Sequence, residues 1–207
     1  MPGRPPPGRA GRVWLAERLE VAQRAAELLE HKQQLLRREQ RRLAELAGRT
    51  GRQWAALAAE ADTWNARALV AGGRDELSRV ASVIGPARIR LEWTSGAGVT
   101  YPSIVATDFP GPPAMAGSAA LPLAAGACSR ALDAAVRHAA ATTALARVET
   151  ELVATVRRLR AIRDRWLPRL AEQLRELDLR LDENEREEIT RLRWAGQRPI
   201  APIMEGS

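Results

Sequence analysis

Apolar residues recur at seven-residue steps through the first third of the chain. One series runs from Leu15 to Trp64 and is apolar except at Thr50, and a second, offset by four residues, is apolar except at two glutamines. Two such seams kept over roughly eight heptads are typical of a coiled coil, so we predict a first coiled-coil helix over residues 13–72. The two series are Leu15, Ala22, Leu29, Leu36, Leu43, Thr50, Leu57 and Trp64, and Leu19, Ala26, Gln33, Gln40, Ala47, Trp54, Ala61 and Ala68.

Glycines interrupt this pattern at two places. Gly48 and Gly51 lie inside it, and each costs about 1 kcal/mol relative to alanine in a helix, so we expect a bend or weak point there. The pair Gly72-Gly73 ends the pattern.

A second helical pattern occupies residues 129–195. Leu145, Leu152, Leu159 and Trp166 keep the seven-residue step. We expect a phase shift near Pro168, because a proline removes one hydrogen bond from the helix and tends to kink it. Beyond it, leucines alternate at steps of three and four residues: Leu167, Leu170, Leu174, Leu177 and Leu181.

The period changes between the two helices, over residues 80–126. Ala87–Trp93 alternates apolar with charged residues, which is typical of a strand, and the glycine-containing stretch 94–98 has turn composition. Val99–Val105 is the expected return strand, which makes a β-hairpin. Pro110–Gly126 is rich in proline, glycine and alanine and has no periodicity, so we predict a loop there.

Neither helix can bury its apolar stripe alone, so we expect the chain to fold back at its middle. The predicted fold class is all-α: a long antiparallel two-helix coiled coil, rod-like, with a short central β-hairpin and loop. Both termini share one tip in this arrangement, with Leu15 close to the Ile189–Leu192 region. Residues 1–12 are expected to be a flexible N-terminal arm and residues 196–207 a flexible C-terminal tail.

Composition agrees with long helices. Hydrophobic residues make up 45% of the 207 positions but aromatic residues only 4%, whereas a compact core usually holds more large rings. Cys128 is the single cysteine, so no internal disulfide forms. The uncharged run Phe109–Ser129 is long enough to cross a bilayer, but it contains four prolines and three glycines. A lipid-exposed helix could not easily satisfy its backbone hydrogen bonds with so many breaks, so we interpret the run as a loop. The first ten residues lack the apolar stretch of a signal peptide, so we expect a soluble, intracellular protein.

Catalytic chemistry has little support in the sequence. His31 and His138 are the only histidines, and neither has a partner at metal-ligand spacing. No phosphate-binding GxxxxGK[ST] loop and no GxGxxG after a strand is present. We therefore expect a protein that is not an enzyme and that has no catalytic residue, cofactor or metal site.

The six tryptophans divide into two groups. Trp54, Trp64 and Trp166 lie on the predicted seams and are interpreted as coiled-coil packing. Trp14 and Trp194 lie near the two chain ends, where they either pack on each other or contact a partner.

Several stretches, in order along the chain, resemble the D subunit of the V-type and A-type rotary ATPases, the central rotor shaft. After Pro7-Gly8-Arg9, the first helix carries Leu28–Leu35, which is similar to the family's Leu-Leu-x-x-Lys-x-x-x-Leu pattern, and the hairpin carries Gly98-Val99-Thr100-Tyr101-Pro102. The last helix carries Arg157–Ile162, then Leu167-Pro168-Arg169-Leu170, then the charged run Glu185–Arg193.

The resemblance implies a non-catalytic central stalk subunit of a rotary ATPase or ATP synthase. In that family both shaft termini insert into a ring of catalytic and non-catalytic subunits. The central region attaches to a small rotor protein, the F subunit, and to a funnel-shaped adaptor on the membrane ring. Rotation couples ATP hydrolysis or synthesis to ion movement, expected here to be of protons. The implied location is peripheral, on the cytoplasmic face of the cell membrane, touching the membrane only through the complex.

Candidate contact residues follow from combining the two termini and the hairpin with this resemblance. The expected contacts with the catalytic ring are Arg9, Arg12, Trp14, Arg186, Arg191, Arg193 and Trp194. The expected contacts with the small rotor protein, or for coupling, are Arg90, Glu92, Trp93, Val99 and Tyr101.

The net charge of +7 leaves alternatives from other classes open. A basic antiparallel coiled coil can lie along RNA or DNA through phosphate contacts. All but one of the 32 basic residues are arginine and the 25 acidic residues are interleaved with them, which favours a solvated charged surface, so no nucleic-acid partner is expected. A plain structural scaffold explains the helices but not the ordered motifs.

Overall fold

The structure is a computed structural model that describes residues 6–110 and 117–196. The chain divides into two compact units: a terminal unit, Met1–Glu30 with Val156–Ser207, and a central unit, His31–Thr155. The predicted arm, loop and tail fall partly on residues 1–5, 111–116 and 197–207, which lie outside the described residues.

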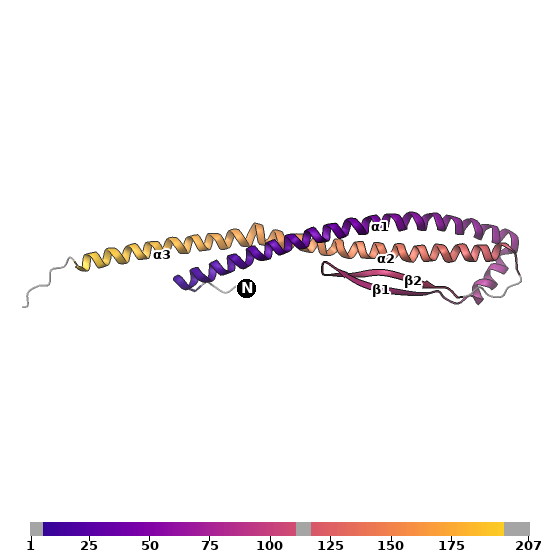
Figure 1. Cartoon of the computed structure of the whole chain (residues 1–207), viewed down its shortest axis with the longest axis horizontal. Coiled ribbons are helices and arrows are strands. Elements are labelled where there is room, and N and C mark those ends of the chain that lie inside the picture. Colours follow the sequence, from indigo (N-terminus) through magenta and orange to yellow (C-terminus); the bar gives the residue numbers. More distant parts are fainter. Residues whose placement is uncertain (1–5, 111–116, 197–207) are drawn as a thin grey trace, which may run out of the picture. The chain divides into compact units, whose positions relative to one another are not determined.

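Long helices with one central hairpin make up the fold, as the sequence predicts (Figure 1). The elements are α1 (Arg9–Val83), β1 (Arg88–Gly96), β2 (Val99–Asp108), α2 (Ala120–Ala161), the π-helix η1 (Ile162–Trp166) and α3 (Leu167–Gly196). The strands pair antiparallel, with an irregularity in register between Glu92 and Trp93. The all-α class with a central β-hairpin is therefore confirmed.

Heptad positions form the core of the central unit. Leu36 and Leu43 of α1 are buried against Ala144 and Val148 of α2. Earlier in α2, alanines at seven-residue steps are buried: Ala127, Ala134 and Ala141. Because the distance between packed helices depends on the side chains at the contact, alanines allow close approach.

The helices are longer than predicted. Residues 9–12 are already helical, and α1 resumes after a kink at Gly73, whose φ of 77° and ψ of 171° are not helical. This break lies where the heptad pattern ends, but ten further residues of α1 follow it. The expected loop gives way to α2 at Ala120 because Pro122 lies in the first turn, where a backbone N–H has no acceptor within the helix.

The expected bend or weak point at Gly48 and Gly51 is not a break in the helix, because the backbone of α1 is helical through both. Gly51 instead makes room for a side chain of α2: a Cβ at position 51 would lie 3.1 Å from Cε1 of His138. That imidazole stacks on Trp54 at 5.7 Å between ring centres, and its Nδ1 lies 3.3 Å from Oγ1 of Thr50.

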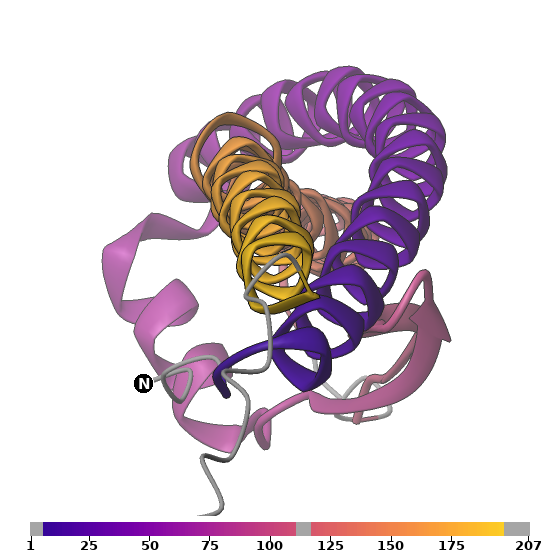
Figure 2. The ribbon, with the colours of Figure 1, turned by 90° about the vertical axis from the view of Figure 1, so that its left-hand side faces the viewer.

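In the terminal unit, the first turns of α1 run antiparallel beside α3 (Figures 1 and 2). Arg9 pairs with Glu185 at 2.7 Å and Arg12 with Asp178 at 2.9 Å, and Glu30 pairs with Arg163. This register puts Leu15 opposite residues 174–177. The expected proximity of Leu15 to Ile189–Leu192 is wrong because α3 continues for several turns beyond the start of α1 (Figure 1).

The phase shift near Pro168 has a structural cause. The N–H of Leu167 donates to the carbonyl of Ile162, so the helix widens to a π turn directly before the proline. Pro168 has no N–H to donate, and a single π turn changes which face of the helix the following residues occupy. The leucine stripe therefore resumes in α3 with altered spacing.

The observed register of the terminal unit predicts a crosslink within one chain. In a Cys128→Ser background, Arg12→Cys with Asp178→Cys is expected to react with a short bismaleimide to give an intrachain product, because their side chains form an ion pair. The matched pair Leu15→Cys with Leu192→Cys is expected to give little. Peptide mapping measures both yields, and the reverse order of yields contradicts this register.

The two glycines inside α1 predict opposite effects on stability. Gly51→Leu is expected to lower the free energy of unfolding by about 1–3 kcal/mol because the leucine meets the imidazole of His138. Gly48→Leu is expected to be neutral or stabilising, because Gly48 is exposed and leucine has the better helix propensity. Urea unfolding followed by circular dichroism compares them, and equal effects would contradict the close-packing explanation.

Candidate functional site

The structure offers surfaces for protein contact as candidate sites. Within residues 6–110 and 117–196, no group of three or more His, Cys, Asp or Glu residues is placed to hold a metal ion. In the same ranges, no helix is both long and apolar enough to cross a membrane.

The first candidate surface lies on α1 and α3 of the terminal unit. Arg9 and Arg12 are exposed but engaged by carboxylates of α3, so they fix the register of the two helices as well as carrying charge. Trp14 is half-buried, with the Arg18 guanidinium 4.5 Å from its ring centre. The structure therefore gives these three residues packing roles in addition to any contact with a partner.

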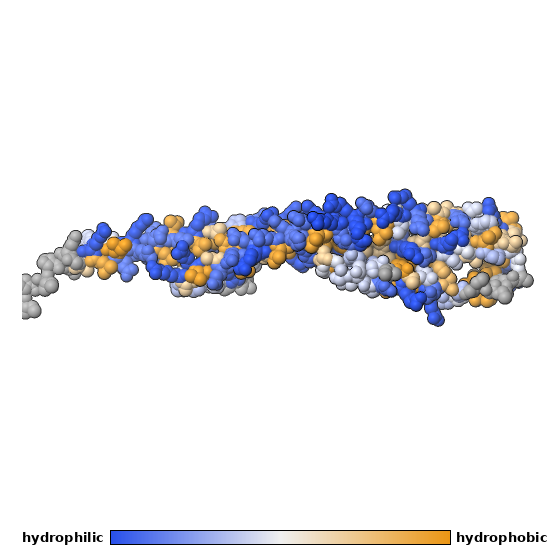
Figure 3. All heavy atoms as spheres, in the orientation of Figure 1, coloured by the Kyte–Doolittle hydropathy of each residue, from blue (hydrophilic) through white to orange (hydrophobic). Residues whose placement is uncertain are grey.

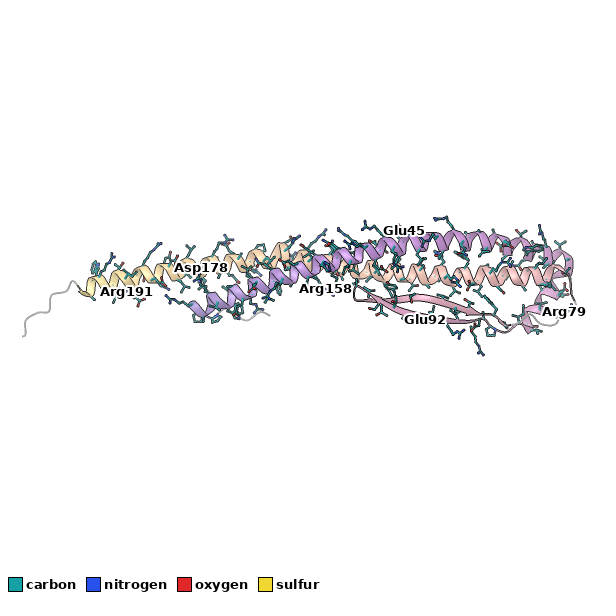
Figure 4. All side chains as sticks on the ribbon, in the orientation of Figure 1. Glu45, Arg79, Glu92, Arg158, Asp178 and Arg191 are labelled. Carbon is teal, nitrogen blue, oxygen red and sulfur yellow. The ribbon has the colours of Figure 1, made fainter. Side chains whose placement is uncertain are left out.

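The end of α3 is fully exposed within the terminal unit. Every residue from 182 to 195 is exposed, including Arg186, Arg193 and Trp194, the last at 75%. Arg191 projects from the final turns and pairs with Glu187 at 2.8 Å (Figure 4). Apolar side chains lie between these charges, with Leu192 67% exposed. An exposed helix end of mixed apolar and arginine character is typical of a surface that a partner covers.

The second set of candidate residues lies on the hairpin, where those of β1 and those of β2 differ in burial. Arg90, Glu92 and Trp93 of β1 are exposed, with Arg90 paired to Asp108 at 3.0 Å. Val99 and Tyr101 of β2 are instead buried in the core of the central unit, Tyr101 to 4% exposure. The apolar face of β2 packs on α1 and α2 of its own chain, so the expected contact of these two residues with the small rotor protein, or for coupling, stays a prediction.

A charged network anchors Tyr101 to α1. The phenol donates to Glu39 at 2.5 Å, and the Arg42 guanidinium donates to the same carboxylate at 2.6 Å. The Arg42 hydrogen bond, with a further one from Tyr101, holds the pKa of Glu39 below its usual value. Burial, with the neighbouring Glu39 carboxylate, raises the pKa of Tyr101. Glu39 is therefore a charged acceptor at neutral pH.

Two further contacts tie the turn half of the hairpin to the helices. Arg147 of α2 donates to the Thr100 carbonyl at 3.0 Å and lies 4.9 Å from the ring centre of Trp93. Lys32 of α1 pairs with Glu151 of α2 at 2.6 Å, and its Nζ would lie 3.7 Å from a Cβ at Gly98. Sequence reasoning did not assign Glu39, Arg147 or Glu151 a role, and only the single lysine and single tyrosine signalled unusual positions.

Comparison with known proteins gives one family. The family model that describes the D subunit of ATP synthase matches residues 14–197. No curated protein matches the chain significantly. The matched range includes both helical regions and the hairpin.

The anchoring network predicts a pH-dependent contribution to stability. Because the folded pKa of Glu39 is depressed, its contribution is present above the unfolded value of about 4.5 and is lost as the pH falls through the folded value. Glu39→Gln is expected to lower the free energy of unfolding by about 1–3 kcal/mol at pH 7. The difference from the original chain is expected to shrink below about pH 4.

Glu45→Gln is the matched control, since Glu45 lies on the same helix and is exposed (Figure 4). It is expected to change stability little at either pH. Urea unfolding at pH 7 and pH 3.5 measures all three chains. An equal loss for Glu39→Gln at both values would show that the carboxylate charge is not what stabilises the hairpin.

Proposed function

Because the chain belongs to the family of ATP synthase D subunits, we propose that it is the rotor shaft of its rotary ATPase, turning inside the catalytic head. It is a stalk subunit of that complex, and in this proposal it hydrolyses no ATP itself. The family match over residues 14–197 carries the proposal, and the helix pairing supports it. The shaft couples ATP hydrolysis or synthesis to movement of ions, expected to be protons, through the membrane ring.

The pairing of the helices suits the transmission of torque. In the terminal unit, the buried Leu15 and the ion pairs of Arg9 and Arg12 oppose sliding of α1 along α3. In the central unit, the pairs Lys32–Glu151 and Glu60–Arg130 join α1 to α2. Individual exposed ion pairs contribute about 0–1 kcal/mol, so resistance to slipping comes mainly from the apolar seam and the pairs set its register.

The exposed end of α3 is the part proposed to contact the ring of catalytic and non-catalytic subunits. Its arginines would make many weak contacts that exchange as the shaft turns. Arg186 and Arg193 have no ion pair with any described residue, which leaves them available for carboxylates of the ring. Trp194 offers a large apolar contact beside them.

The exposed side of β1 is proposed to contact the small rotor protein, the F subunit, through Arg90, Glu92 and Trp93. The funnel-shaped adaptor would connect the shaft to the membrane ring. The chain would then lie on the cytoplasmic face of the membrane and touch it only through the complex. The nucleic-acid alternative is weaker because many of the arginines already pair with carboxylates of their own unit.

A reversible lock between shaft and ring tests rotation. A disulfide from Arg193→Cys, in a Cys128→Ser chain, to a cysteine on a neighbouring ring subunit is expected to stop multi-turnover ATP hydrolysis, because the shaft can no longer turn. Reduction is expected to restore the rate. Steady-state hydrolysis is measured with the purified complex before and after reduction.

The matched control places the cysteine at Arg193 without a cysteine on the ring. That complex is expected to keep its rate under the same oxidation. Undiminished hydrolysis with the crosslink fully formed would mean that this chain does not rotate against the ring.

A further inference from the structure

An apolar groove crosses one end of the central unit. It has a volume of about 710 Å³ and is lined by Val80 of α1, the residues that follow α1, the base of the hairpin and the first turns of α2. Figure 3 shows apolar side chains gathered at this end of the unit. Its apolar lining includes Val80, Ile84, Phe109, Leu121, Ala125 and Leu132, and we call this surface the apolar groove.

The groove remains accessible although its lining is apolar. Ile84, Phe109 and Leu132 are each more than a third exposed, and Ile89 and Leu91 of β1 add exposed apolar surface close to it in sequence. Contiguous apolar surface of this kind on a folded protein usually marks a contact site. It is separate from the end of α3, which belongs to the other unit.

The spacing of the lining residues indicates the form of the occupant. The α2 residues that line the groove recur at steps of three and four, which places them on one face of the helix. Val80, in the last turn of α1, and Ile84, just beyond the end of α1, also line it. From Leu121 to Leu132 this face extends for about 16 Å, the length of roughly three helical turns. A helical face of this length beside an apolar hollow fits another helix laid along it.

Unpaired positive charge beside the groove indicates the chemistry of the occupant. Arg79 and Arg88 adjoin the lining residues Val80 and Ala87, are exposed, and form no ion pair with any residue that the structure describes (Figure 4 labels Arg79). The neighbouring arginines Arg90, Arg130 and Arg137 are instead neutralised by Asp108, Glu60 and Asp133. Charge complementarity therefore favours carboxylates on the occupant.

We propose that the apolar groove binds an amphipathic helix of another subunit of the complex, about three turns long, whose apolar stripe is bordered by Asp or Glu. The apolar stripe fills the hollow, and the acidic residues pair with Arg79 and Arg88. This inference rests on the proposed function only in that the helix is supplied by a subunit of the ATPase.

Cys128 provides a reporter inside the groove. It is half-buried, lines the groove, and lies with its Sγ 3.4 Å from the Asn65 amide. Because it is the single cysteine of the chain, a thiol reagent labels this chain at one place only. A helix seated on the groove covers it.

The first test compares labelling of Cys128 in the free chain and in the purified ATPase complex. N-Ethylmaleimide is expected to react at least tenfold more slowly in the complex, as measured by mass spectrometry of the intact subunit. Equal rates in a complex that contains this chain overturn the groove proposal and leave the stalk function standing. Failure of the chain to co-purify with ATPase subunits overturns the stalk function instead.

The second test identifies the occupant. A photoreactive benzoylphenylalanine at Leu132 in the complex is expected to crosslink to a peptide of another subunit that has apolar residues at helical spacing and flanking carboxylates. Crosslinks confined to this chain, or to a peptide without that pattern, overturn the proposal.

Charge reversal separates the contribution of the acidic residues of the occupant from that of its apolar stripe. The double variant Arg79→Glu and Arg88→Glu is expected to restore labelling of Cys128 in the complex at least threefold. Arg49→Glu with Arg52→Glu, on exposed arginines of α1 outside the groove lining, is the matched control and is expected to leave the labelling unchanged. Equal effects of the two double variants overturn the assignment of acidic flanks.

Discussion

The packing of apolar seams between antiparallel helices is the interaction on which the remaining features depend. In the central unit, leucines of α1 meet small residues of α2, and truncation of one such buried leucine costs about 2–5 kcal/mol. In the terminal unit, a leucine stripe of α3 meets α1. Because the apolar positions recur at regular steps, sliding one helix along the other separates every matched pair at once. This regularity makes the pairing suitable for transmitting torque.

The hairpin packs directly on the apolar seam between α1 and α2. Val99 and Tyr101 pack in one core with Leu36 and Leu43. Glu39 accepts a hydrogen bond from the Tyr101 phenol, and Arg147 donates one to the Thr100 carbonyl. As a consequence β2 faces inward and β1 faces solvent. β1, the end of α3 and the apolar groove each present exposed surface to a partner.

Much of this arrangement follows from residue periodicity. The heptads predicted both helical regions, and strand alternation predicted the hairpin. The face on which the hairpin packs was not predictable, because the contact of Tyr101 with Glu39 joins residues 62 positions apart. The register of α1 against α3 was missed for a similar reason: equally apolar stripes fit in several registers, and the ion pair of Arg12 with Asp178 selects one. Pro122 was misinterpreted because a proline in the first turn of a helix is tolerated.

Direct observation of rotation tests the central claim, that this chain turns as the shaft. A gold particle attached through Ser95→Cys, at the exposed turn end of β1 in a Cys128→Ser chain, reports the motion of the central unit when the catalytic ring of the complex is fixed to a surface. With ATP present, we predict continuous rotation of the particle in one direction. A particle that stays fixed while the same complexes hydrolyse ATP would contradict it.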